Sequence, residues 1–168
     1  MTVNESRYFA KCWLNRGQSL NFEIRQLTDY REKLLNELGG GVASYTPKEI
    51  QRDTSKGQAH ADTLRLEYSE TCEKIERRFA EFAKINNETL DFIAELDDAD
   101  ERALLTGRHV NFKPWGSIYR QLHVGRATAF RHYNTALDNI FGVLYQNNAD
   151  FRYTVDVENT AKLNNETL

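Results

Sequence analysis

Large apolar side chains recur at helical spacing through the first quarter of the chain. One set repeats every seven residues and further apolar residues fill the alternate step: Trp13, Leu20, Leu27 and Leu34, with Ile24 and Leu38. This pattern predicts an amphipathic helix over about 5–38. Gly17 lowers helix propensity by roughly 1 kcal/mol, so a break is expected between Asn15 and Ser19.

A second stripe of the same kind predicts a helix over about 60–85. Its members lie three or four residues apart: Leu64, Tyr68, Cys72, Ile75, Phe79 and Phe82. Between the two stripes, Gly39 to Gly41 suit a helix C-cap, and Pro47 follows in a loop expected to run to about Gln58. The pair predicts either an antiparallel hairpin or a coiled-coil arm that pairs with a second copy.

The two stripes also carry more large apolar residues than a thin two-helix arm can bury alone. We therefore expect this region to bind a partner or a second copy, with a dimer favoured.

Shorter helical patterns follow from Leu90 onward. Asn87 is a plausible N-cap for a helix that carries Leu90, Ile93 and Leu96. Further helices are expected over 98–110 and 114–122, and a long one over about 126–145. After Gln146 the chain is polar, and "FRYTV" is expected to pack as a short strand or to stay mobile. The predicted fold is all-α, with a helical hairpin at 1–86, a DNA-binding domain at 87–146 and a polar tail at 147–168.

Composition excludes several classes of protein. The 168 residues suit one domain or a small domain with a helical extension, and no long apolar run predicts a membrane span or secretory segment. We expect a soluble, cytoplasmic protein in which Cys12 and Cys72 are reduced. Metal-ligand spacings, a Gly-rich phosphate loop and clustered carboxylates are all missing, so neither enzymatic activity nor a metal or cofactor is expected.

Charge is distributed unevenly along the chain. Although it has 22 basic and 25 acidic residues in total, the stretch from Arg102 to Leu137 contains no Asp or Glu. Six bases lie in this stretch: Arg102, Arg108, Lys113, Arg120, Arg126 and Arg131. A surface without carboxylates avoids repulsion by phosphates, which supply most of the sequence-independent affinity for DNA. The stretch is therefore a candidate DNA-binding surface.

The same stretch has the pattern of a helix-turn-helix. Pro114 suits the first position of one helix, and Gly125 can cap the next. On the second helix the predicted buried side is Ala129, Tyr133, Ala136, Leu137 and Ile140. Two basic helices joined by a short turn, with the small Ala129 where they approach, are typical of this motif.

In such a motif the second helix lies in the major groove and the first crosses the backbone. The outward residues of the second helix are the candidates for reading bases: Arg126, Ala127, Thr128, Phe130, Arg131 and Asn134. The candidates for binding phosphate lie on or before the first helix: Arg108, Lys113, Trp115 and Arg120.

The stretch "ALLTGRHVNFKPWGSIYRQLHVGRATAFRHYNTALDNI" resembles phage-encoded transcription regulators of the RinA and ArpU type. The matching features include Leu104–Leu105, Lys113 with Trp115, and Phe130–Arg131. Upstream, "VASYTPKEIQRDTSKGQAHAD" and "EYSETCEKIERRF" resemble the same family, where a hairpin of long helices comes first. The resemblance implies a helix-turn-helix similar to the fourth region of sigma factors, and an activator of late or packaging genes that acts with host RNA polymerase.

The chain departs from that family's pattern at three positions. His123 stands where glycine is usual in the turn, Gly125 replaces a Ser or Thr cap, and Tyr119 replaces a small residue. We expect the bulky Tyr119 to change the angle between the two helices.

Two other functions are compatible with the same residues. A small terminase subunit for DNA packaging also joins a helix-turn-helix to an oligomerising helical region, and would form a ring of many subunits. A protein-interaction module would have no salt-dependent affinity for DNA.

Overall fold

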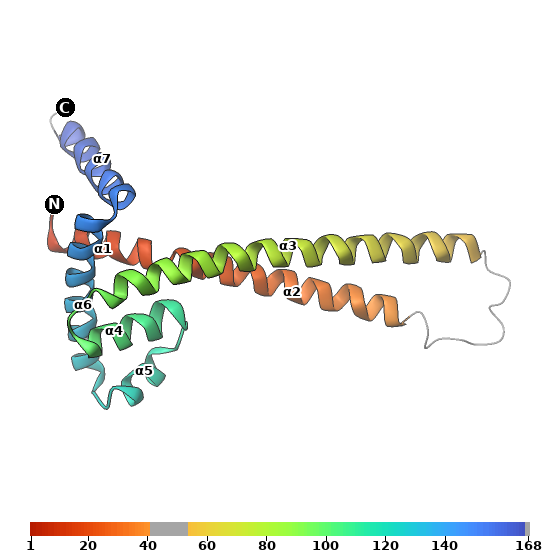
Figure 1. Ribbon diagram of the computed structural model, residues 1–168, viewed down its shortest axis with the longest axis horizontal. Coiled ribbons are helices and arrows are strands. Elements are labelled where there is room, and N and C mark those ends of the chain that lie inside the picture. Colours follow the sequence, from red (N-terminus) through yellow and green to blue (C-terminus); the bar gives the residue numbers. More distant parts are fainter. Residues whose placement is uncertain (41–53, 167–168) are drawn as a thin grey trace. The chain divides into compact units, whose positions relative to one another are not determined.

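The computed structural model describes residues 1–40 and 54–166. Helix accounts for 89% of these residues, which contain no strand, so the predicted all-α class is confirmed. The helices are α1 (Val3–Leu14), α2 (Arg16–Gly40), α3 (Thr54–Ala94), α4 (Ala99–Leu105), the π-helical turn η1 (Thr106–Val110), α5 (Trp115–Gln121), α6 (Arg126–Asn147) and α7 (Ala149–Glu166) (Figure 1).

The chain forms two compact units. One comprises residues 20–83, and the other combines residues 1–19 with 84–168. In the first unit α2 and α3 run antiparallel, because Glu23 pairs with Arg78 at 3.0 Å while Tyr30 donates to Glu67 at 3.3 Å. Its buried apolar side chains include Leu20, Ile24, Leu34, Leu64 and Ile75. The loop expected around Pro47 lies outside the described residues.

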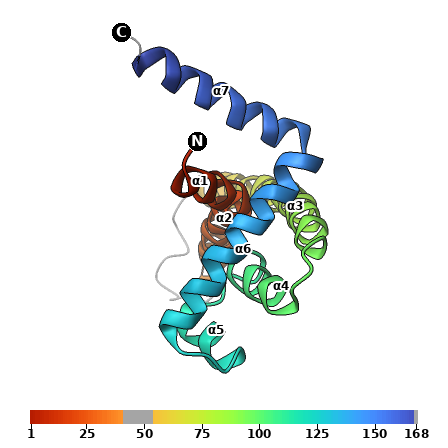
Figure 2. The ribbon, with the colours of Figure 1, turned by 90° about the vertical axis from the view of Figure 1, so that its left-hand side faces the viewer.

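The second unit is built around α6. This helix packs against α1, α4 and α7 (Figure 2). Its core contains large side chains that are almost completely buried: Leu14, Ile93, Leu104, Leu105, Leu137, Ile140, Leu144 and Val155. The first helix of the chain therefore belongs to the same unit as the predicted DNA-binding residues.

The expected break in the first helix is present. α1 ends at Leu14, and Asn15 separates it from α2, where Gly17 is buried. The Asn15 amide N–H donates to the Lys11 carbonyl at 2.9 Å, which satisfies the end of α1.

Two predicted boundaries are wrong. Asn87 does not cap a new helix, because α3 continues through it to Ala94. The buried Thr89 and Ile93 extend the buried side of α3 at four-residue spacing, and packing outweighs the modest helix propensity of Asn. The tail is neither strand nor irregular: it forms α7, where Phe151 and Val155, also four residues apart, enter the core.

Candidate nucleic-acid interface

α5 and α6 are joined by a short turn. Gly125 is the N-cap of α6, as predicted. Pro114 is the N-cap of α5 and not its first helical residue, because its ψ of 148° is extended. His123 has a φ of 54°, in the left-handed region that glycine adopts without strain. The turn therefore needs the conformation that the glycine of the RinA and ArpU pattern would supply.

Replacing His123 by Gly is expected to stabilise the protein by a few tenths to about 1 kcal/mol, because it removes the clash of a Cβ atom in this conformation. His123→Ala is the matched control, since Ala keeps the Cβ. Urea denaturation of both variants measures the effect. Equal stability of the two variants would show that the turn is not strained.

An aromatic cluster fixes α5 on α6. The Trp115 ring centroid lies 4.7 Å from that of Phe130 and 5.0 Å from that of Tyr133. Tyr119 stacks on Trp115 at 5.9 Å and meets Phe130 edge-on at 6.3 Å. The bulky Tyr119 thus fills space between the two helices. The rings of Trp115 and Phe130 thus pack α5 against α6.

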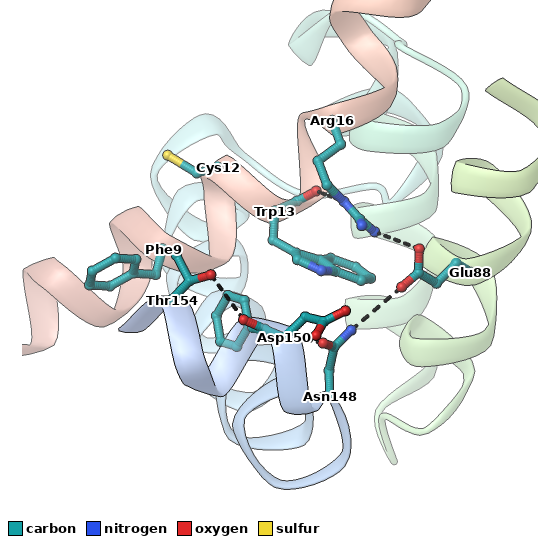
Figure 3. Close-up of a pocket in the computed structure, with 9 residues that line it drawn as sticks. Phe9, Cys12, Trp13, Arg16, Glu88, Asn148, Asp150 and Thr154 are labelled. Carbon is teal, nitrogen blue, oxygen red and sulfur yellow. Dashed lines mark hydrogen bonds and ion pairs between the residues drawn. The ribbon is translucent and has the colours of Figure 1, made fainter. Parts of the chain in front are cut away.

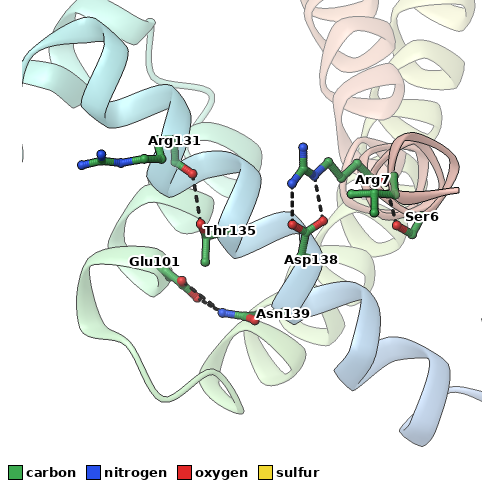
Figure 4. A network of polar contacts seen from close by, with 8 residues as sticks. Ser6, Arg7, Glu101, Arg131, Thr135, Asp138 and Asn139 are labelled. Atoms are coloured by element: carbon green, nitrogen blue, oxygen red, sulfur yellow. Dashed lines mark hydrogen bonds and ion pairs between the residues drawn. The ribbon is translucent and has the colours of Figure 1, made fainter.

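The predicted buried side of α6 is confirmed: Ala129, Tyr133, Ala136, Leu137 and Ile140 are all buried. On the other side Arg126, Ala127 and Arg131 are exposed, while Thr128 and Asn134 are half-buried. The side chain of Arg131 points away from the neighbouring helices (Figure 4). The guanidinium of Arg126 lies 5.8 Å from the centroid of the Phe130 ring.

Three further bases surround α5. Lys113 donates from Nζ to Gln121 Oε1 at 3.0 Å, and Arg120 donates from Nε to the Gly116 carbonyl at 3.2 Å. Arg108 lies over Trp115, 5.4 Å from its centroid. Arg102 is different, because its Nη1 donates to the carbonyls of Leu96 and Asp97. Arg102 thus ties α4 to the loop that follows α3.

The first carboxylate after the acid-free stretch is neutralised. Asp138 accepts two hydrogen bonds from Arg7 of α1, at 2.7 and 2.6 Å (Figure 4). Asp138 lies two helical turns beyond Arg131, so an unpaired charge here would repel an anion on the outward face of α6. Glu101, the last acid before the stretch, is buried and accepts from Asn139 Nδ2.

A chain of polar contacts links Asn15, the C-cap of α1, to η1 and α6. His109 lies between Asn15 Oδ1, 2.9 Å from Nδ1, and Tyr133 Oη, 3.0 Å from Nε2. Burial first, and the nearby Arg108 and Lys11 second, lower the pKa of His109 to about 4. Burial raises the pKa of Tyr133 to about 12. His109 is therefore neutral: its Nδ1–H donates to Asn15, and Tyr133 donates to Nε2.

The sequence patterns do not predict these contacts. Arg7 and Asp138 are separated by 131 positions, and Asn15 and His109 by 94. Helical periodicity shows that a face is buried but not which distant helix covers it.

Residues 1–40 and 54–166 contain neither a candidate metal site nor a membrane-spanning helix. No group of three or more His, Cys, Asp or Glu side chains lies close enough there to hold a metal ion. Within the same ranges, every helix is too short or too polar to cross a membrane.

A comparison with protein-family models matches residues 44–140 to DUF1492, a family described as of unknown function. Comparisons with curated proteins and with solved structures gave no match. The matched segment contains all of α3, α4, η1 and α5 and extends into α6 as far as Ile140. This is more than half of the chain, and the chain therefore belongs to the DUF1492 family.

Proposed function

We propose that the protein is a sequence-specific DNA-binding transcription regulator in which α5 and α6 form a helix-turn-helix. One observation carries the proposal. The outward side of α6 presents Arg126, Ala127 and Arg131 at its amino-terminal end, within a stretch of chain that contains no carboxylate.

The proposed docking places the first turns of α6 in the major groove. That groove is wide enough for one α-helix, and an Arg in it can bond O6 and N7 of guanine. Arg126 and Arg131 are the two arginines on this part of α6, and both are exposed. Thr128, between them in sequence, and Asn134, three residues after Arg131, complete the proposed reading surface.

The proposed phosphate contacts come from α5 and the residues just before it. In sequence Lys113 precedes and Arg120 follows Trp115, whose ring packs in the aromatic cluster. In a helix-turn-helix the first helix crosses the DNA backbone, so these bases would bind phosphate and carry no sequence information. Arg108, whose guanidinium lies over the Trp115 ring, is a third candidate.

The likeness to the RinA and ArpU regulators supplies the finer part of the proposal. It suggests activation of phage late genes through contact with host RNA polymerase, by a helix-turn-helix like the fourth region of sigma factors. The residues themselves support DNA binding alone, and the regulatory role rests on the resemblance.

Footprinting of the purified full-length chain on the DNA around its own gene, at several salt concentrations, tests the proposal. We expect a protected site and an affinity that falls steeply with salt. Absence of both would favour a protein-interaction module. A ring of many subunits in light scattering would favour a packaging component.

We also propose that the two-helix unit binds a second copy. In the part of this unit that the structure describes, large exposed apolar side chains are Phe22, Tyr30, Leu35, Leu66 and Phe79. Burying such side chains stabilises an interface by about 25 cal/mol per Å² of apolar surface.

The double variant Phe22→Ser, Phe79→Ser is expected to shift a dimer toward monomer, because both side chains are more than half exposed. Light scattering of the full-length chain over a range of concentrations measures this shift. Tyr153→Ser, which removes a large exposed side chain from α7, is the control and should leave the dimer intact. A wild-type chain that stays monomeric at high concentration would rule out the pairing.

A further inference from the structure

A cavity of about 330 Å³ lies between α1 and the beginning of α7 (Figure 3). Its wall includes the side chains of Phe9, Trp13 and Phe151, each less than a tenth exposed. This volume is at the lower end of the range for small-molecule sites, and an aromatic wall with a few polar groups is their usual composition. The cavity therefore has the size and lining of a site for a small ligand.

Most polar groups of this cavity already have partners. The Arg16 guanidinium lies 3.9 Å from the Trp13 ring centroid and donates to Glu88 Oε2 at 3.1 Å. The other oxygen of Glu88 accepts from Asn148 Nδ2 at 3.5 Å, and Asn148 Oδ1 caps α7 by accepting from the Phe151 amide at 2.9 Å. The polar wall is thus held in place without a ligand.

Asp150 is the exception. Its carboxylate forms no hydrogen bond or ion pair with any side chain or backbone group in the described ranges, while its carbonyl accepts from Thr154. The lining carries one positive charge, on Arg16, and two negative charges, on Glu88 and Asp150. Since Arg16 and Glu88 pair with each other, one negative charge remains beside an aromatic wall.

We propose that this cavity binds a small organic cation with an aromatic or apolar body, such as a primary arylalkylamine. The body would pack on Phe9, Trp13 and Phe151, and the ammonium group would pair with Asp150. This inference does not depend on DNA binding.

The two tryptophans of the chain allow a direct test. Trp13 borders the cavity and Trp115 belongs to the α5–α6 cluster, so nitrogen-15 NMR should give one indole N–H signal for each. A Trp115→Phe variant assigns the two signals. Titration with phenethylamine should move the Trp13 signal and leave the Trp115 signal in place.

Comparing probes of different charge then tests whether the cavity prefers a cation. The neutral 2-phenylethanol and the anionic 3-phenylpropionate should bind about tenfold more weakly than phenethylamine, and Asp150→Asn should remove this preference. Glu158→Gln, which removes another exposed carboxylate from α7, is the control and should keep the preference for phenethylamine. The proposal is overturned if phenethylamine leaves the Trp13 signal unchanged, if the three probes bind equally, or if Asp150→Asn retains the preference.

Discussion

Replacing Arg131 or Arg126 by Ala is expected to weaken binding to the footprinted site by about 1–3 kcal/mol and to affect scrambled DNA much less. Both side chains are exposed at the amino-terminal end of α6, and Arg131 points away from the helices that pack against it (Figure 4). Loss of a bond to guanine removes discrimination between sequences. The gap between specific and non-specific affinity should therefore narrow.

Lys113→Ala and Arg120→Ala should behave differently. These bases belong to the proposed phosphate-binding set, so each change should weaken binding to both DNAs about equally. The slope of log affinity against log salt concentration should become shallower by roughly 1. Arg152→Ala is a matched control for the loss of one charge, because Arg152 is exposed on α7. It follows Phe151, which packs on Phe141 at the far end of α6. Binding is measured by fluorescence anisotropy on both DNAs at several salt concentrations.

Equal effects of Arg126→Ala and Lys113→Ala on the two DNAs would contradict this docking. An effect of Arg152→Ala as large as that of Arg131→Ala would show that only net charge matters.

Acidification is expected to destabilise the second unit through His109. In the folded protein the pKa of His109 is lowered to about 4, whereas in the unfolded chain it has the ordinary histidine value of 6.5. Above pH 6.5 the group is neutral in both states and has no effect. Between pH 6.5 and about 4 only the unfolded chain takes up the proton, so the free energy of unfolding falls by about 1.4 kcal/mol per pH unit.

The total loss approaches about 3 kcal/mol, and about 2 kcal/mol of it should appear between pH 7 and pH 5. His109→Gln keeps a donor and an acceptor but does not titrate, so its stability should fall less over the same interval. Urea denaturation at both pH values measures how far the free energy of unfolding falls in each protein. Carboxylates contribute equally to the wild type and the variant, so their contribution cancels when the two falls are compared. His60→Gln, at an exposed position on α3, is the control and should behave as the wild type. An equal fall in the wild type and His109→Gln would contradict the buried neutral histidine.

The sequence predicts the helices of this protein better than it predicts which helices pack against one another. The spacing of Ala129, Tyr133 and Leu137 identifies the buried side of α6, and Gly125 marks its beginning. Both signals are local, because they depend on residues within a few turns of one another. The four-residue spacing of Phe151 and Val155 is also helical, but most of the residues around them are polar, so the pattern is too weak to predict α7.

Contacts between distant segments could not be predicted in this way. Periodicity places α1 in an amphipathic helix but does not show that Arg7 pairs with Asp138 or that Asn15 meets His109. The candidate interface could likewise be predicted only in part. Charge identified the basic stretch, whereas the positions of Trp115 and Phe130 in the aromatic cluster depend on how α5 packs on α6.

Site-specific photocrosslinking tests most directly whether α6 contacts DNA. A photoreactive amino acid would replace Ala127, which is exposed between Arg126 and Thr128, and in a second protein would replace Tyr153, exposed on α7. With the footprinted DNA, we expect crosslinks from position 127 and none from position 153. Crosslinking from 153 alone, or equally from both positions, would contradict the placement of α6 in the groove, as would DNA binding without any crosslink from 127.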